Sequence, residues 1–223
     1  MPVIPFISPK GGVGKTTAVT VVATQLALKA PVRIIDADPN RPVIAWSRLP
    51  GRPDNLIVTE ADQNDIMDRI DEAAREAPFV LIDCEGSASL SVAYAIGAAD
   101  LVIVPTQASQ LDALQGGRAL KLIRDQERSL RRRIPHRVLF TRTSSALRTK
   151  NLAAIQQQLA DAGVPLLSTH LHEREAFKAM FSFGGGLELL DTKQVSSPEK
   201  AVANARALTA EILDVLRAEG LGE

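Results

Sequence analysis

The sequence contains 223 residues, of which 45% are hydrophobic and 23% are charged, so it is long enough for one α/β domain with a large core. Lysine plus arginine and aspartate plus glutamate both number 26. The formal net charge is therefore zero, which excludes a general electrostatic attraction to nucleic acid. Binding to nucleic acid would need a local basic patch. The single cysteine, Cys84, excludes a disulfide framework within the chain, and we expect a reducing, cytoplasmic environment.

Short apolar runs alternate with longer helical patterns along the chain. We predict strands at residues 3–7, 32–36, 56–58, 79–83, 101–105 and 137–141, with a weaker strand near Leu166. We predict helices at residues 16–28, 63–76, 90–98, 112–130, 151–162, 174–183 and 198–216. The alternation predicts an α/β fold with a doubly wound, mainly parallel sheet and helices on both faces, in one domain over residues 1–223. In such sheets the ligand lies beyond the carboxyl ends of the strands.

The chain starts without the basic region of a signal peptide, and no apolar run approaches the roughly 20 residues that span a bilayer. We therefore expect a soluble protein without a membrane partner.

The first chemical motif is a glycine-rich segment between the first predicted strand and the first predicted helix. Glycines let successive backbone N–H groups curl around a phosphate chain, and the following helix adds its positive N-terminal end. We expect Lys15 to reach the β- and γ-phosphates and the Thr16 hydroxyl to coordinate Mg²⁺. Pro9 stands where the general P-loop pattern has glycine. The predicted nucleotide-binding residues are Lys10, Gly11, Gly12, Val13, Gly14, Lys15, Thr16 and Thr17.

Carboxylates follow two of the predicted strands. Asp36 and Asp38 come at the end of the second strand, and Asp83 ends the fourth strand in the arrangement of a Walker B motif. Negative side chains beside a triphosphate are unfavourable unless they hold Mg²⁺ or orient the attacking water. Asp36 or Asp38 could instead form an Asx-turn after the strand, and Asp83 could merely cap the next turn.

The segment from Lys10 to Thr17 resembles the deviant Walker A box of the ParA/MinD family of ATPases, which has a second, signature lysine at the position of Lys10. The resemblance implies binding of ATP and Mg²⁺ and a nucleotide-sandwich homodimer. In that dimer the signature lysine reaches the phosphates of the other subunit, much as an arginine finger does. Residues 32–40 resemble switch I of the family, with Asn40 in place of glutamine.

The resemblance also implies roles for individual residues. The catalytic candidates are Lys10, Lys15 and Asp38, with Asp38 positioning the water, and the metal-site candidates are Thr16, Asp36 and Asp83. Arg142 matches the end of a strand that contacts adenine, and residues 171–177 resemble the loop and helix that close the base pocket. Residues 101–107, followed by Leu111 and Asp112, resemble a loop at the dimer face. The segment Cys84-Glu85-Gly86 departs from the Asp-x-Pro-Pro sequence that is common in the family, so the geometry of switch II stays open.

Several branches of the family lack support in this sequence. The nitrogenase iron protein and the arsenite and tail-anchor ATPases need cysteine pairs, whereas this chain has only Cys84. The last predicted helix mixes acidic and basic residues, unlike the basic membrane-binding helix of MinD. The P-loop begins only a few residues into the sequence, so we expect a small ParA type without an N-terminal helix-turn-helix domain and without sequence-specific operator binding.

Non-specific DNA binding would depend on local basic residues. Arg148 and Lys150, in a loop after a predicted strand, are the favoured DNA contacts. A second basic run, at residues 128–137, ends a predicted helix, where cations also complement the helix dipole.

These observations favour a ParA-like ATPase that dimerises with ATP, binds nucleoid DNA and positions a cargo, reset when a ParB-like protein or cargo adaptor stimulates hydrolysis. The cargo could be a plasmid, a chromosome region, a protein cluster or a DNA-transfer complex. Two alternatives stay open: a metabolic phosphotransferase of the dethiobiotin synthetase type, and a nucleotide-dependent switch with little hydrolysis.

Overall fold

The computed structural model describes residues 1–86, 89–107, 110–144, 150–193 and 195–221. Its centre is a sheet of seven strands in the order β3-β2-β4-β1-β5-β6-β7, and every pairing between neighbours is parallel. The strands are β1 (Val3–Phe6), β2 (Val32–Ala37), β3 (Leu56–Glu60), β4 (Phe79–Cys84), β5 (Val102–Gln107), β6 (His136–Thr143) and β7 (Leu171–His172). The predicted fold class is therefore confirmed.

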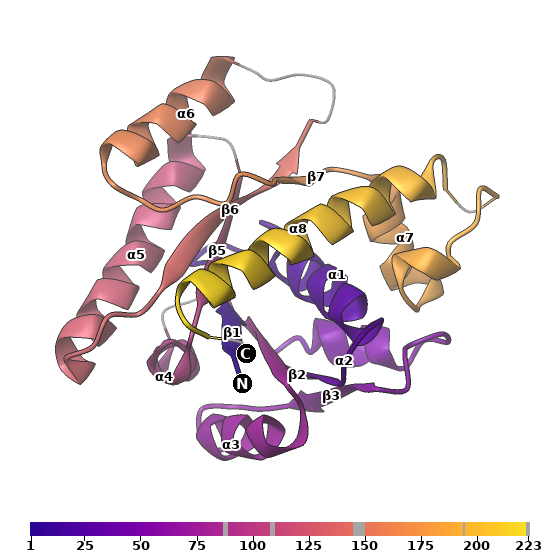
Figure 1. Cartoon of the computed structure of the whole chain (residues 1–223), viewed down its shortest axis with the longest axis horizontal. Coiled ribbons are helices and arrows are strands. Elements are labelled where there is room, and N and C mark those ends of the chain that lie inside the picture. Colours follow the sequence, from indigo (N-terminus) through magenta and orange to yellow (C-terminus); the bar gives the residue numbers. More distant parts are fainter. Residues whose placement is uncertain (87–88, 108–109, 145–149, 194, 222–223) are drawn as a thin grey trace.

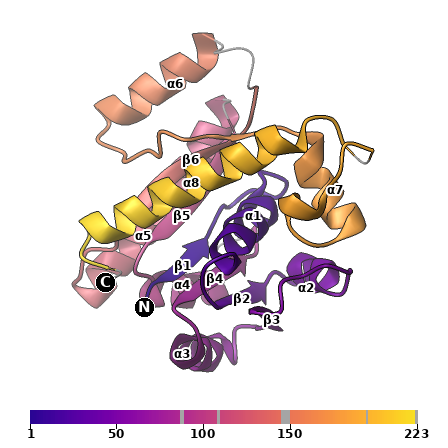
Figure 2. The same cartoon turned by 45° about the vertical axis from the view of Figure 1, so that its right-hand side comes forward.

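Helices cover both faces of this sheet (Figures 1 and 2). They are α1 (Lys15–Ala27), α2 (Pro42–Ser47), α3 (Ile66–Glu76), α4 (Leu90–Ala98), α5 (Gln110–Leu130), α6 (Lys150–Asp161), α7 (Glu175–Phe183) and α8 (Pro198–Ala218), with a short 3₁₀ turn at Leu187–Leu189. Residues of α1, α2, α7 and α8 share one buried cluster, and residues of α3, α4 and α5 share another. Because successive strand residues point to opposite faces, Ile4 and Phe6 join the first cluster and Val3 and Ile7 join the second.

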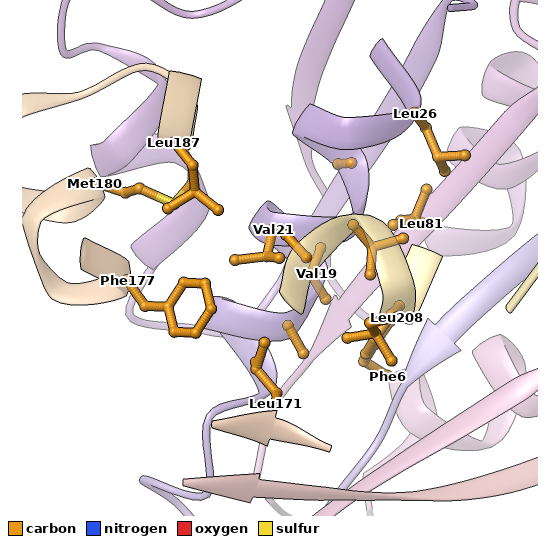
Figure 3. Packing of buried hydrophobic residues seen from close by; sticks show 14 of the residues in the cluster. Phe6, Val19, Val21, Leu26, Leu81, Leu171, Phe177, Met180, Leu187 and Leu208 are labelled. Carbon is orange, nitrogen blue, oxygen red and sulfur yellow. The ribbon is translucent and has the colours of Figure 1, made fainter. Parts of the chain in front are cut away.

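The first cluster ties the two ends of the chain together. Figure 3 shows the side chains of Phe177 and Met180 on α7 directed toward Val19 and Val21 on α1. Leu208 of α8 lies in the same cluster and is fully buried. The glycine-rich loop at the start of α1 is thus supported by helices that come last in the sequence.

Most predicted elements are present, with ends that differ by a few residues. The exceptions are α2, β7 and the 3₁₀ turn, which were not predicted, and the strand near Leu166, which is reduced to a single bridge to Val138. Pro165 precedes that bridge and has no N–H group to extend the pairing. Among the described residues, no helix is long and apolar enough to cross a membrane.

Candidate functional site

A cavity of about 730 Å³ opens at the carboxyl ends of the strands. Two walls enclose it. The P-loop wall consists of Gly11, Gly12, Gly14, Lys15, Thr16, Thr17, Asp38, Pro39, Asn40, Glu85 and Gly86, and the α7 wall consists of Thr141, Arg142, Leu171, His172, Glu173, Arg174, Phe177, Lys178 and Phe181. The structure therefore brings together most of the predicted nucleotide-site residues. Lys10 and Val13 do not line the cavity.

The P-loop is held by its carbonyl groups. The Gly12 carbonyl accepts hydrogen bonds from Gln107 Nε2 and from the Arg142 guanidinium, each at 3.2 Å. The Val13 carbonyl accepts one from Thr141 Oγ1 at 2.6 Å. Gly14, the residue before α1, has φ 92°, in the left-handed region that favours glycine. These contacts fix the loop to β5 and β6 while the N-terminal turn of α1 lines the cavity, an arrangement suited to an anion.

Lys15 and Thr16 begin α1, and both line the cavity. Lys15 is only 6% exposed. Thr16 Oγ1 donates a hydrogen bond of 2.7 Å to Asp83 Oδ2, which joins the predicted Walker A and Walker B segments. A buried ammonium group needs an anionic partner, and the role of Lys15 at the phosphates stays a prediction.

Asp83 is fully buried at the end of β4. Burial raises its pKa to about 7, with nearby Asp36 acting in the same direction and Thr16 and Lys15 acting against it. Its Oδ1 has no hydrogen-bond partner in the described part of the chain. A buried carboxylate with an unused oxygen, beside a threonine hydroxyl, is a donor set that fits Mg²⁺, which prefers oxygen ligands.

Both carboxylate oxygens of Asp36 accept hydrogen bonds from backbone amides. Its Oδ2 accepts hydrogen bonds from the amides of Val43 and Ile44, at 2.8 and 2.9 Å, and its Oδ1 accepts one from the amide of Asp38 at 3.3 Å. Burial raises the pKa of Asp36, although these amide contacts oppose the rise. The carboxylate thereby caps the start of α2 and fixes the loop that carries Asp38. Its contribution to a metal shell stays a prediction.

Asp38 both lines the cavity and shapes its own loop. Its Oδ1 accepts hydrogen bonds from the backbone amide and the side-chain Nδ2 of Asn40, both at 2.9 Å. This is the Asx-turn that the sequence left open, formed by a side chain that also lines the cavity. Lys10, in contrast, lies outside the cavity lining, and its backbone amide contacts Ser8 Oγ at 3.4 Å.

The α7 wall starts at a β-bulge. The pairing of β6 with β7 shifts between Thr141 and Thr143, and Arg142 between them has φ 53°, an uncommon value for a residue with a side chain. The bulge lets the Arg142 guanidinium bridge the walls, because it donates to the Gly12 carbonyl and pairs with Glu173 at 3.1 Å.

The buried part of this wall is formed by aromatic and apolar side chains. Phe177 is 4% exposed and Leu171 is 2% exposed. Burial lowers the pKa of His172, as does nearby Arg174. Residues 171–177 were predicted at this place, whereas Lys178 and Phe181 were missed. The spacing of four between Phe177 and Phe181 puts both on one face of α7, which is the signal that could have identified Phe181.

The structure describes the side chains of only one of the two basic runs that were considered for DNA binding. Arg148 lies outside the described residues, and Lys150 begins α6 with a side chain that is not described. In the other run, Arg132 donates to the carbonyls of Gly97 and Ala99, at 2.6 and 3.0 Å. Arg133 and Arg137 both pair with Glu219. These contacts support a structural role for the run at the end of α5.

Comparisons with known proteins agree with this geometry. The profile of the VirC1 protein family matches residues 1–218. The chain is 36% identical over 222 residues to Protein ParA of Rhizobium radiobacter, and the match covers 97% of this chain and 100% of that protein.

Two solved structures share the fold. The ATP complex of a Cyanothece McdA variant has a TM-score of 0.72 and 19% identity, and the match covers 92% of this chain and 96% of that one. A cobyrinic acid a,c-diamide synthase from Mycobacterium smegmatis, bound to ADP and magnesium, has a TM-score of 0.70 and 19% identity, covering 99% and 97%. The family match and the relative show more than a shared fold: the chain belongs to the VirC1 family, within the ParA/MinD type of P-loop ATPases.

Proposed function

We propose that this chain, acting as one domain over residues 1–223, is a ParA-like ATPase that dimerises with ATP, binds DNA non-specifically and positions a cargo. The observation that carries the proposal is the Thr16–Asp83 hydrogen bond beside buried Lys15, at the phosphate end of a cavity large enough for a nucleotide. Lys15 supplies a positive charge for the triphosphate, and Thr16 and Asp83 supply oxygen ligands for Mg²⁺.

In this proposal each group has a defined task. The N-terminal turn of α1 and Lys15 hold the β- and γ-phosphates, while Thr16 and Asp83 are the residues that would hold Mg²⁺. When bound, Mg²⁺ neutralises charge on the β- and γ-phosphate oxygens. Arg142 and the α7 wall take the base and ribose. Asp36 fixes the loop of Asp38, so that Asp38 can orient the attacking water.

Lys10 fits a role in the partner subunit. It belongs to the same loop as Lys15 but does not line the cavity of its own chain. A lysine delivered across a dimer stabilises charge on the transferred phosphoryl group without adding to ATP binding by the monomer. We expect ATP to hold two chains face to face through this contact, and a ParB-like protein or cargo adaptor to trigger hydrolysis and release.

Retention on non-specific duplex DNA is the experiment that tests this function. The purified protein is applied with ADP, ATP or a slowly hydrolysed ATP analogue, at two salt concentrations. Salt-sensitive retention with ATP or the analogue alone is expected, because phosphate contacts release counterions. Lys10→Ala should keep ATP affinity but lose dimerisation and retention. Charge reversal at Arg148 and Lys150 should keep the dimer but abolish retention. A protein that stays unbound in every nucleotide state contradicts the proposal.

The second candidate is a biosynthetic phosphotransferase. It is favoured by the fold shared with a cobyrinic acid a,c-diamide synthase and by a second cavity of about 250 Å³ beside the nucleotide site. An enzyme of this kind would turn over ATP only with a small co-substrate. Hydrolysis without a co-substrate, at a rate per subunit that rises with protein concentration as dimers form, would separate the ATPase from this alternative.

A further inference from the structure

Glu85 lies in the wall between two cavities. It follows the last residue of β4 and lines the nucleotide cavity. It also lines a neighbouring cavity of about 250 Å³, which extends toward Arg41, Asp62 and Ser91. Among the described residues, Pro39, beside Asp38, is the only other one that lines both cavities. Glu85 is therefore on the same side of the nucleotide cavity as Asp38, but on a different strand end.

The backbone around Glu85 is closely held. Asp83 and Cys84 before it are fully buried and are paired in register with Asp36 and Ala37 of β2. Gly86 after it packs against the P-loop, since a Cβ at Gly86 would be 3.2 Å from the Gly11 amide nitrogen. The Glu85 side chain thus starts from a point fixed on one side by the sheet and on the other by the P-loop.

Within the part of the chain that the structure describes, no cationic side chain pairs with the carboxylate at this position. Among the residues that the structure describes, Glu85 forms no ion pair, whereas Asp83 is engaged with Thr16 and Asp36 with three backbone amides. A negative side chain in the wall of a polyanion site is unfavourable unless it faces a metal ion or a water. Oδ1 of Asp38 already accepts two hydrogen bonds from Asn40, so only its other oxygen is left to hold a water molecule. A second acceptor beside Asp38 would complete the contacts of that water.

We propose that Glu85 is a catalytic residue that, together with Asp38, holds the attacking water by accepting its hydrogen bond. The water oxygen then bonds to the γ-phosphorus, and the bond to the bridging oxygen breaks with its electron pair leaving on ADP. The water proton passes to an oxygen of the released phosphate. Glu85 acts by orienting the water, so that the water oxygen is in line with the bond that breaks. The inference rests on the proposed ATPase function.

The test compares Glu85→Ala with Glu85→Gln and with Glu60→Gln, a matched change at the end of β3 on a side chain that is 66% exposed and outside the nucleotide cavity. ATP affinity is measured with a fluorescent analogue, hydrolysis in single turnovers with excess protein, and dimer lifetime by dilution in ATP. Glu85→Ala should slow hydrolysis about a hundredfold with ATP affinity within threefold of the unmodified protein, and the ATP dimer should last longer. Glu85→Gln should keep a tenth or more of the rate, because its amide oxygen also accepts a hydrogen bond.

Three results overturn the inference. They are an unchanged rate in Glu85→Ala, an equal loss of rate in Glu85→Ala and Glu85→Gln, and a loss of ATP affinity as large as the loss of rate. If Glu85→Ala unfolds, Glu85→Asp takes its place, because the shorter side chain withdraws the acceptor, and an unmodified rate in Glu85→Asp contradicts the role. Failure of the unmodified protein to bind or hydrolyse ATP would instead reject the proposed function itself.

Discussion

The two walls of the nucleotide cavity are built in different ways. The P-loop wall comes from short segments at the ends of β1, β2 and β4, with glycine before α1 and with its loop carbonyls held by side chains of β5 and β6. The α7 wall comes from residues 141–181 and depends on the packing of α7 against α1 (Figure 3). The residues of the phosphate end can therefore be recognised in a local sequence pattern, whereas the other end depends on helix packing that no local pattern shows.

This contrast predicts different ligand responses. Changes in the P-loop wall should weaken binding of ATP and of inorganic tripolyphosphate alike. Changes in the α7 wall should weaken ATP binding but leave tripolyphosphate binding intact, because the base and ribose are missing from that ligand. Each variant below is therefore titrated with both ligands.

The largest effect is expected for Lys15→Ala. Removing the buried ammonium group should weaken the binding of both ligands at least a hundredfold. A charged hydrogen bond contributes about 1.5–3 kcal/mol, and the phosphates also lose the positive charge beside them. The measurement is calorimetric titration at fixed salt and Mg²⁺. Lys178→Ala is the matched control, since that lysine lines the α7 wall and its side chain is 58% exposed. A loss in the control as large as in Lys15→Ala would break the comparison of the walls.

A smaller effect is expected for Phe177→Leu. The aromatic ring is buried and lines the cavity, and its replacement should weaken ATP binding about fivefold, in line with roughly 1 kcal/mol for an aromatic contact. Tripolyphosphate affinity should stay at the unmodified value. Phe183→Leu, on the same helix but 48% exposed, controls for the loss of a ring. Equal weakening of both ligands by Phe177→Leu would show that α7 supports the P-loop rather than the base.

The smallest effect is expected at Arg142, which joins the walls. Arg142→Ala should weaken ATP about threefold, because the side chain is 46% exposed and exposed ion pairs contribute up to about 1 kcal/mol. Arg142→Gly removes the same side chain but relieves the positive φ. It should be more stable than Arg142→Ala by about 1 kcal/mol in chemical denaturation. Equal stabilities would mean that the bulge relaxes when the arginine is lost.

The sequence predicted the fold class and the P-loop wall because both follow from local patterns. Apolar strands and the spacing of Lys10 and Lys15 are visible in the chain itself, and a Walker B carboxylate at Asp83 follows from its strand. The turn made by Asp38 and Asn40 was one of two alternatives, and only coordinates show that Asp38 forms the turn and lines the cavity as well.

Other features depend on tertiary contacts and could not be predicted. The short helix α2 starts where the carboxylate of Asp36, near the end of the preceding strand, accepts hydrogen bonds from two of its amides, and β7 has only two residues. The left-handed Arg142 has none of the usual sequence signals, since asparagine or glycine is expected at such a position. The place of Glu85 between two cavities follows from the register of β4 with β2 and from the contact of Gly86 with the P-loop.

The Asp36 cap has a practical consequence for α2. It fastens this helix to the loop of Asp38, and α2 carries Trp46, the one tryptophan in the sequence, which is 1% exposed within the first core cluster. Indole emission from the unlabelled protein therefore originates from a single fluorophore that is mechanically linked to the loop facing the nucleotide. We expect its emission to change when that loop rearranges, so that Trp46 would serve as an intrinsic optical probe of the nucleotide site.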